Sequence, residues 1–337
     1  MWLAEVSWVK NEASTELSLS MCCGGIDETL SPVRGFRIPL SAALFTALIV
    51  VAGACGDGDA GAGQPAAGAG FDEQRAFDDL EAQVAYGPRP AGSEASREMT
   101  FWLADQLRAA GVRHVRIQRP YRNVVGIIPG RRSGSVVLGA HHDTKDIPDF
   151  VGANDGASGV AVVLELARAL PDRVAGPSIE IALFDAEEAR GDKPFEADGT
   201  RGSRQYVRYA RSGGQGSPPL DEIRAMVLFD LVGDCDLQIP REPFSSAELY
   251  GRFRTAAKRL SGGDSAPFVG DTTPVEDDHT SFTDRGIPAV DLIDFAFGPG
   301  PAPGAYWHTT DDTLDKVCAS SLGAVGRPAL VAIPKIR

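Results

Sequence analysis

The chain alternates between short apolar runs and segments with helical periodicity, and this alternation constrains the fold more than any other feature. Five of the runs contain β-branched residues and have the length of buried strands; they span residues 124–128, 135–138, 179–184, 226–229 and 287–293. Such runs alternate with helices in proteins whose central sheet is covered on both faces. The sequence therefore predicts an α/β fold with a mixed, mostly parallel sheet.

Helices are expected before these strands and between them. Phe77, Leu80 and Val84 recur at helical spacing, and Ser93 is placed to cap a second helix. Residues 156–170 are apolar on nearly every side, which is typical of a helix packed deeply against a sheet. We therefore expect helical layers over the sheet.

Residues 34–54 have the features of an export signal. Arg34 and Arg37 precede an apolar stretch at residues 38–51, and small residues lead to Cys55. This order is typical of a bacterial lipoprotein, in which Cys55 carries the lipid and becomes the first residue of the mature chain. A simple membrane anchor is the alternative, but about 16 apolar or small residues fall short of the roughly 20 that span a bilayer. We therefore expect an exported protein, tethered to a membrane of the cell envelope.

The signal divides the chain into segments with different expected roles. Residues 1–33 have no clear periodicity and are expected to be a misassigned start or an unstructured extension. Residues 55–70 are rich in Gly and Ala, as flexible linkers are. Residues 71–337 are then expected to form the folded, catalytic domain.

The charge balance excludes one class of partner. The chain carries 46 Asp+Glu against 33 Lys+Arg, a net charge of −13. Residues 1–54 hold only 5 of the acidic residues and 3 of the basic ones. The acidic character therefore belongs to the folded domain. No basic face is expected that would bind the phosphates of nucleic acid.

Two of the five cysteines, Cys235 and Cys318, lie in the folded domain. Two cysteines do not define a disulfide framework, and neither has metal-ligand spacing to another cysteine. We expect buried thiols. A single bridge is left open, because an exported protein folds under oxidising conditions.

Acidic and histidine residues follow directly after three of the apolar runs. His141 and Asp143 follow the run at 135–138, Glu187 and Glu188 follow the run at 179–184, and Asp230 follows the run at 226–229. Ligands of open α/β sheets bind outside the carboxyl ends of the strands. Buried, unpaired charges are costly there, and a metal ion would compensate them. Asp, Glu and His ligands without Cys suit a catalytic Zn²⁺ with an open position.

Two further residues and two loops complete this expected site. Asp155 lies between glycines at the start of the apolar helix, and His308 follows Trp307 near the end of the chain. A lone Asp at a helix start is usually a cap, so the assignment depends on the combination of motifs. Loop-like stretches at 191–200 and 297–305 follow strand ends and are expected to form walls of the site.

The order of these motifs resembles the zinc exopeptidase superfamily, which contains the bacterial double-zinc aminopeptidases and the glutaminyl cyclases. The resemblance covers residues 71–330 or so, and it implies a role for each motif. Asp155, Glu188 and His308 would hold one zinc, and Glu187 would be the general base. The other matching residues imply a possible second metal at His141 and Asp230, and orientation of the His141 ring by the carboxylate of Asp143.

The segment Glu276-Asp277-Asp278-His279 resembles the glutaminyl cyclase branch. That branch implies that N-terminal Gln of peptides is converted to pyroglutamate with loss of ammonia, with Glu187, Asp230 and Asp277 as the proton-relay carboxylates. Trp307 and His279 would then line the substrate pocket. A zinc aminopeptidase is the alternative, because residues 189–193 lack the tryptophan that many cyclases carry there. A non-catalytic peptide-binding domain on the same fold is the third reading.

Overall fold

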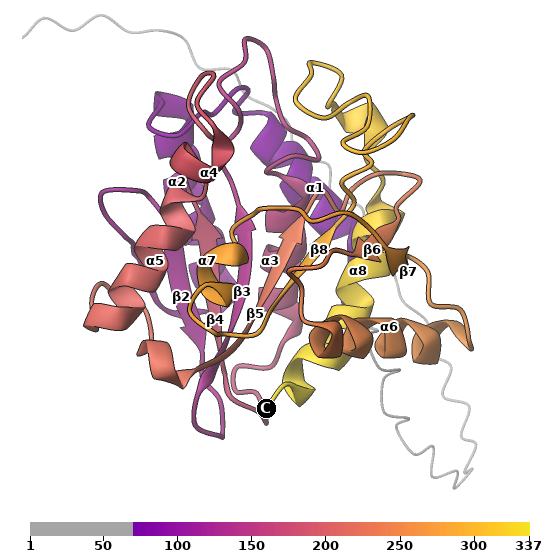
Figure 1. Ribbon diagram of the computed structural model, residues 1–337. Helices are drawn as coiled ribbons and strands as arrows, with labels where there is room; N and C mark the ends of the chain where they lie inside the picture. Colours follow the sequence, from indigo (N-terminus) through magenta and orange to yellow (C-terminus); the bar gives the residue numbers. More distant parts are fainter. Residues whose placement is uncertain (1–69) are drawn as a thin grey trace, which may run out of the picture. The chain divides into compact units, whose positions relative to one another are not determined.

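The computed structural model describes residues 70–337 and has one central sheet (Figure 1). Its six strands lie in the order β1-β2-β4-β3-β5-β8. They are β1 (Arg113–Ile117), β2 (Val124–Ile128), β3 (Ser135–His141), β4 (Ser178–Phe184), β5 (Ile223–Asp230) and β8 (Ala289–Ile293). Strands β3, β4, β5 and β8 are mutually parallel, whereas β2 pairs antiparallel with both of its neighbours, β1 and β4. The predicted mixed, mostly parallel sheet is confirmed.

Helices cover both faces of this sheet (Figure 1). Buried side chains of α1, α2, α3, α6 and α8 share one core with the sheet, and those of α5 and α7 share the other. The helices are α1 (Glu73–Val84), α2 (Glu94–Ala109), α3 (Ser158–Ala169), α4 (Phe195–Asp198), α5 (Arg201–Ser212), α6 (Ala247–Ser261), α7 (Thr280–Thr283) and α8 (Ala319–Ala332). Ser93 caps α2 as expected, because its side chain accepts a hydrogen bond from the Ser96 amide.

Alternation along the central strands builds the two cores. In β3, Val136 and Leu138 face the larger core, whereas Val137 faces the smaller one. Every residue of β3 is buried, since a parallel strand with helices on both faces has no solvent side. The continuous apolar runs in the sequence reflect this burial.

Three strands were not expected from the sequence. The edge strand β1 has the sequence RHVRI with mostly exposed positions, so it lacks an apolar run. Strands β6 (Ile239–Arg241) and β7 (Phe268–Asp271) form a separate two-stranded sheet and have three and four residues. Such short segments carry too few residues for a periodic signal.

Cys235 and Cys318 form a disulfide. The expectation of two buried thiols was therefore wrong. The bond joins the loop after β5 to the residue before α8, across 83 residues of sequence. Closing a loop of this length restricts the unfolded chain and so stabilises the fold.

The segments expected to be an extension, a signal and a linker lie outside the described residues, apart from Gly70. Within residues 70–337, no helix is both long and apolar enough to cross a membrane.

Candidate active site

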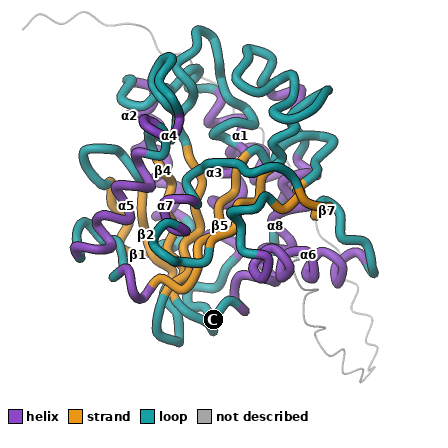
Figure 2. Tube along the Cα trace, in the orientation of Figure 1, coloured by secondary structure: helices purple, strands orange, loops and turns teal. Residues whose placement is uncertain are grey.

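The predicted site residues converge at the carboxyl ends of the parallel strands. His141 ends β3 and Asp230 ends β5, while Glu187 and Glu188 follow β4 by three and four residues. The strand ends are adjacent, because His141 pairs with Phe184 across the β3–β4 ladder. Figure 2 shows that long loops gather above this edge of the sheet.

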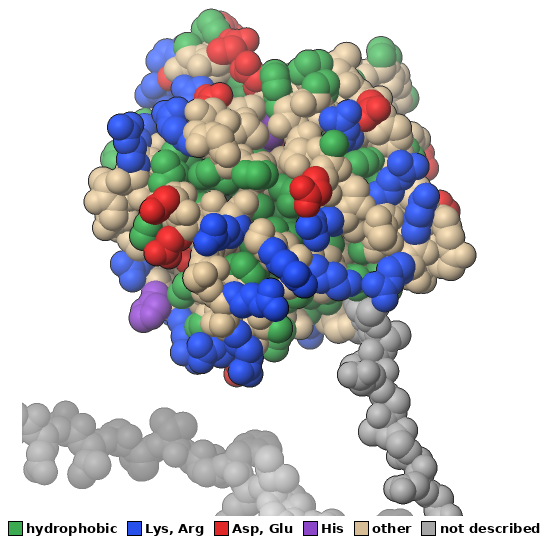
Figure 3. Space-filling model, turned by 60° about the horizontal axis from the view of Figure 1, so that its bottom comes forward, with side chains coloured by type: hydrophobic (Ala, Val, Ile, Leu, Met, Phe, Trp, Pro, Cys, Tyr) green, Lys and Arg blue, Asp and Glu red, His purple; other side chains and the backbone are tan. Residues whose placement is uncertain are grey.

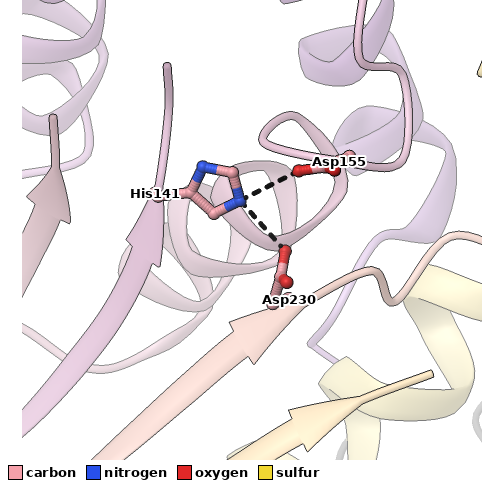
Figure 4. A group of neighbouring side chains, drawn as sticks. All are labelled: His141, Asp155 and Asp230. Carbon is pink, nitrogen blue, oxygen red and sulfur yellow. Dashed lines mark hydrogen bonds and ion pairs between the residues drawn. The ribbon is translucent and has the colours of Figure 1, made fainter. Parts of the chain in front are cut away.

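His141 faces two carboxylates from different elements (Figure 4). Its Nε2 atom lies 3.2 Å from Asp230 Oδ1 and 3.3 Å from Asp155 Oδ1. All three side chains are buried. These atoms form one group of donors that are close enough together to hold a metal ion.

Asp155 also belongs to a second donor group. Its other oxygen, Oδ2, lies 3.3 Å from His308 Nε2, which lies 3.0 Å from Glu188 Oε1. The donor atoms of Asp155, Glu188 and His308 lie within 4.8 Å of one another. The two groups therefore share Asp155, which offers one oxygen to each.

The donor chemistry of these groups fits zinc. Each group combines one imidazole nitrogen with carboxylate oxygens, which are ordinary zinc ligands. Four buried carboxyl groups, those of Asp155, Glu187, Glu188 and Asp230, lie around two histidines. A divalent cation would offset the excess negative charge that this cluster carries when ionised.

The backbone around the site adopts conformations that are rare for residues other than glycine. Ala186, directly before Glu187, has φ of 61°, and Leu231, directly after Asp230, has φ of 48°. His308 itself has φ of 53°. Left-handed backbone costs free energy at such residues and persists where the surroundings hold it. Here it turns three site side chains towards one pocket.

Asp143 supports the site differently from the prediction. Its carboxylate lies 3.8 Å from His141 Nδ1, which is too long for a hydrogen bond, and its backbone oxygen is the nearer partner at 3.2 Å. The carboxylate instead accepts hydrogen bonds from the amides of Glu187 and Glu188, at 3.1 and 3.3 Å. Asp143 therefore holds His141 through its carbonyl and the Glu-Glu pair through its carboxylate.

Two residues to which the sequence analysis gave no role position the loop that carries Asp155. Asp312 is buried, and its carboxylate accepts hydrogen bonds from the amides of Asn154 and Asp155 at 2.7 and 2.9 Å. Arg89 is fully buried and donates to the backbone oxygens of His142, Val151 and Gly152. In the sequence, Arg89 is a charged residue between two prolines, which gives no sign of burial.

A pocket of about 390 Å³ opens onto both donor groups. Its apolar wall comes from Val275, Ile293, Phe295 and Trp307. The Trp307 ring stacks on the His308 ring, with centroids 3.7 Å apart, and meets the Phe295 ring edge-on. Trp307 thus lines this pocket and also fixes the plane of the His308 ring.

Of the two loops expected to form walls of the site, one lines the pocket and the other lines a neighbouring cavity. The loop at 191–200 contains the short helix α4 and contributes Lys193, Phe195 and Glu196 to the pocket. The loop at 297–305 lines a larger cavity of about 850 Å³, which adjoins the pocket across Ile293 and Phe295. None of the predicted site residues lines this larger cavity.

The segment 276–279 divides between the pocket and the interior. Asp277 lines the pocket, and one of its oxygens, Oδ2, has no hydrogen-bond partner among the described residues. His279 is fully buried and is absent from the pocket wall; its Nε2 lies 3.2 Å from Glu242 Oε1. The predicted pocket role of His279 was therefore wrong, because the side chain points behind the wall.

Burial changes the acidity of the pocket carboxylates. Desolvation, with the nearby charges of Glu188 and Asp277, raises the pKa of Glu187 well above its ordinary value. Desolvation and the charges of Asp230 and Asp278 raise the pKa of Asp277 in the same way. Both carboxyl groups therefore keep their protons to a higher pH than ordinary Glu and Asp side chains do.

The mostly parallel sheet carries two donor groups at its carboxyl edge, and the two groups share one aspartate. This arrangement defines an α/β protein of the zinc exopeptidase type. Residues 123–333 match the model of peptidase family M28. The chain belongs to this family.

Solved structures with the same fold include two kinds of enzyme. A glutaminyl cyclase from an Acidobacteriales bacterium is 32% identical with a TM-score of 0.70, over 82% of this chain and 97% of that one. A leucine aminopeptidase precursor from Bacteroides thetaiotaomicron is 26% identical with a TM-score of 0.67, over 79% and 98%.

Among curated relatives, glutaminyl-peptide cyclotransferase of Gloydius blomhoffii is 28% identical over 242 residues, which are 61% of this chain. A glutaminyl-peptide cyclotransferase-like protein of Bos taurus is 32% identical over 224 residues, 57% of this chain and 55% of that protein. The match spans 64% of the Gloydius protein, and so less than two thirds of its length.

Proposed function

We propose that the chain is a glutaminyl-peptide cyclotransferase, which converts N-terminal Gln of peptides to pyroglutamate and releases ammonia. One observation carries the proposal: Glu187, Asp230 and Asp277 line the same pocket as the donor group of Asp155, Glu188 and His308. Three carboxyl groups beside an electrophilic centre suit proton transfer within the substrate. The relatives named as cyclotransferases support the same reaction.

Asp155, Glu188 and His308 would hold zinc in this enzyme. When bound there, zinc supplies a Lewis acid that polarises the side-chain carbonyl of the substrate Gln. The chain supplies the rest of the site, and Trp307 keeps the His308 ring in place by stacking on it.

Glu187 is the proton carrier in this proposal. The α-amino nitrogen of the substrate attacks the side-chain amide carbon, a C–N bond forms, and the bond to the amide nitrogen breaks. Glu187 takes one proton from the attacking nitrogen and gives it to the departing nitrogen, which leaves as ammonia. Asp230 and Asp277 line the same pocket, and Asp277, when ionised, stabilises the protonated form of Glu187. No water enters the balance.

The apolar wall suits this chemistry. Val275, Ile293, Phe295 and Trp307 surround the place where a Gln side chain would fold back on its own amine. They bury the methylene groups of the substrate and keep water from the amide carbon. A hydrolase would need that water.

A zinc aminopeptidase is the second candidate, and one observation favours it. The other donor group, His141, Asp155 and Asp230, is complete, with distances of 3.2 and 3.3 Å. A second metal there would engage the free amine of a substrate while Glu187 activates a water for hydrolysis. A purely binding role is disfavoured, because the base Glu187 and both donor groups are all in place.

Product analysis with a metal count separates these candidates. We expect ammonia and a cyclised product from Gln-initiated peptides, little free amino acid from Leu-initiated peptides, and about one tightly bound zinc per chain, as the cyclase reaction requires a single Lewis acid. Ammonia release, product mass and metal content would be measured on the same preparation. Two zincs per chain with rapid release of Leu would make the chain an aminopeptidase.

We also propose that the chain is exported and carries a lipid on Cys55. The disulfide between Cys235 and Cys318 supports the export, since such bonds persist in oxidising compartments. Radiolabelled fatty acid should enter the parent chain in a bacterial host, and Cys55→Ser should abolish the label and either release the protein from membranes or block its processing. An unlabelled parent chain would remove the lipid from the proposal.

A further inference from the structure

The end of the domain opposite the active site carries a dense group of cations. Residues 55–337 are acidic overall, with a net charge of −11. Even so, Lys and Arg side chains gather in a band across this end (Figure 3). No basic face was expected from the sequence, because net charge is a total over all residues. The fold separates the positive charges from the negative ones.

Loops at the amino ends of the parallel strands form the centre of this band. Arg131 and Arg132 lie between β2 and β3, and Arg173 lies between α3 and β4. The loops are held together, because the Arg131 amide donates to the oxygens of Val174 and Gly176. The guanidinium groups of Arg131 and Arg132 are exposed and form no ion pair within the described residues.

The band continues onto the C-terminal segment and α6. Gly176 lies beside the backbone oxygens of residues 334 and 336, which flank Lys335. Arg252 donates to the Lys335 oxygen, and both line a hollow of about 330 Å³ together with Arg259. We define the basic face as Arg131, Arg132, Arg173, Arg252, Arg259 and Lys335. Acidic residues are interspersed with it: Glu248, which pairs with Arg252, Asp172, and the exposed Asp221 and Glu222 directly before β5.

The chain leaves the domain at this same end. Gly70, the first described residue, lies beside Ala169 at the end of α3, and Arg173 follows four residues later. Fourteen residues lie between Cys55 and Gly70. Even a fully extended chain of that length spans no more than about 50 Å. A lipid on Cys55 would therefore keep the basic face close to the bilayer.

We propose that the basic face binds the anionic phospholipid headgroups of the membrane that carries the tether. Each Lys or Arg near an anionic surface strengthens binding about fivefold, so several of them hold an otherwise acidic domain in one orientation. The active-site pocket opens at the opposite end of the strands. Docking in this way points the pocket away from the membrane, towards peptides in solution. The inference uses the tether as a guide, but the docking itself needs no lipid on the protein.

Vesicle binding tests the docking without the tether. The full chain with Cys55→Ser would be mixed with vesicles of 30% phosphatidylglycerol in phosphatidylcholine, and its partition coefficient measured by sedimentation at low salt. We expect binding that weakens as salt screens the charges. When Arg131→Glu and Arg132→Glu are added to this chain, its partition coefficient should fall by at least about 25-fold, because the loss of two cations alone has an effect of that size.

A matched control separates this face from net charge. Arg97→Glu with Arg204→Glu makes the same change in charge at the starts of α2 and α5, near the active-site end, and should leave most of the binding. Ammonia release from a Gln-initiated peptide should be unchanged in both pairs, which shows that they fold. The proposal is overturned if the parent chain ignores anionic vesicles, if it binds pure phosphatidylcholine or a DNA duplex equally well, or if the control pair loses as much binding.

Discussion

Glu187→Gln is expected to keep its zinc and to lose about 10²- to 10⁴-fold in turnover of a Gln-initiated peptide, the usual cost of removing a general base. The amide has the shape of the carboxyl group, so it preserves the pocket, but it accepts no proton from the attacking amine. Glu187 is not one of the paired donors in either group, and only its backbone amide is held by Asp143. Zinc content and turnover should therefore separate in this variant.

The matched control for this variant is Glu276→Gln. Glu276 lines the same pocket but is exposed, and no hydrogen bond of its side chain is present in the described residues. We expect its turnover to stay within a few-fold of the parent. Turnover would be measured with zinc content on both variants. Near-normal turnover by Glu187→Gln would remove that residue from the mechanism.

The sequence predicted the sheet because burial leaves a direct mark on it. The continuous apolar run of β3 reports a strand with helices on both faces, and His141 at its end then marks the carboxyl edge of the sheet. Asp230 at the end of β5 is placed by the same reasoning. Side chains that follow neighbouring parallel strands meet at one edge, whatever the intervening loops do.

Side-chain direction, by contrast, was not predictable from a motif. Asp277 and His279 are two residues apart, yet the loop before α7 turns one into the pocket and the other into the interior beside Glu242. Asp143 was expected to hold His141 with its carboxylate, but the turn at Ala186 brings the amides of the Glu-Glu pair closer to it. The direction of each side chain depends on the local backbone angles, and a short sequence motif does not specify these angles.

Long-range partners were missed for a related reason. Asp312 holds the Asp155 loop from 157 residues away in the sequence, and Cys235 bonds to Cys318 across 83. Considered alone, Asp312 has the ordinary role of an aspartate in a turn, and each cysteine that of a buried thiol. Only the packing of the C-terminal segment against the strand ends brings these partners together.

Asp155→Asn is expected to remove zinc more completely than any other single change in the pocket. Asp155 offers one oxygen to each donor group, at 3.3 Å from His141 and 3.3 Å from His308, so one substitution weakens both. Even the loss of an outer partner of a metal ligand costs about 10- to 100-fold in affinity. We therefore expect zinc affinity to fall by more than about 100-fold, measured by competition with a chelator.

Thermal unfolding gives a second measurement of the same effect. Zinc that binds the folded chain alone raises the unfolding temperature, so added zinc should stabilise the parent and leave Asp155→Asn nearly unchanged. Asp149→Asn is the matched control, because Asp149 is exposed in the same loop and its φ of 62° suits asparagine. Its zinc affinity should equal that of the parent. Zinc retention by Asp155→Asn equal to that of the control would show that the two groups do not share this aspartate as a ligand, and the metal would then have to depend on Glu188 with His308 or on Asp230 with His141.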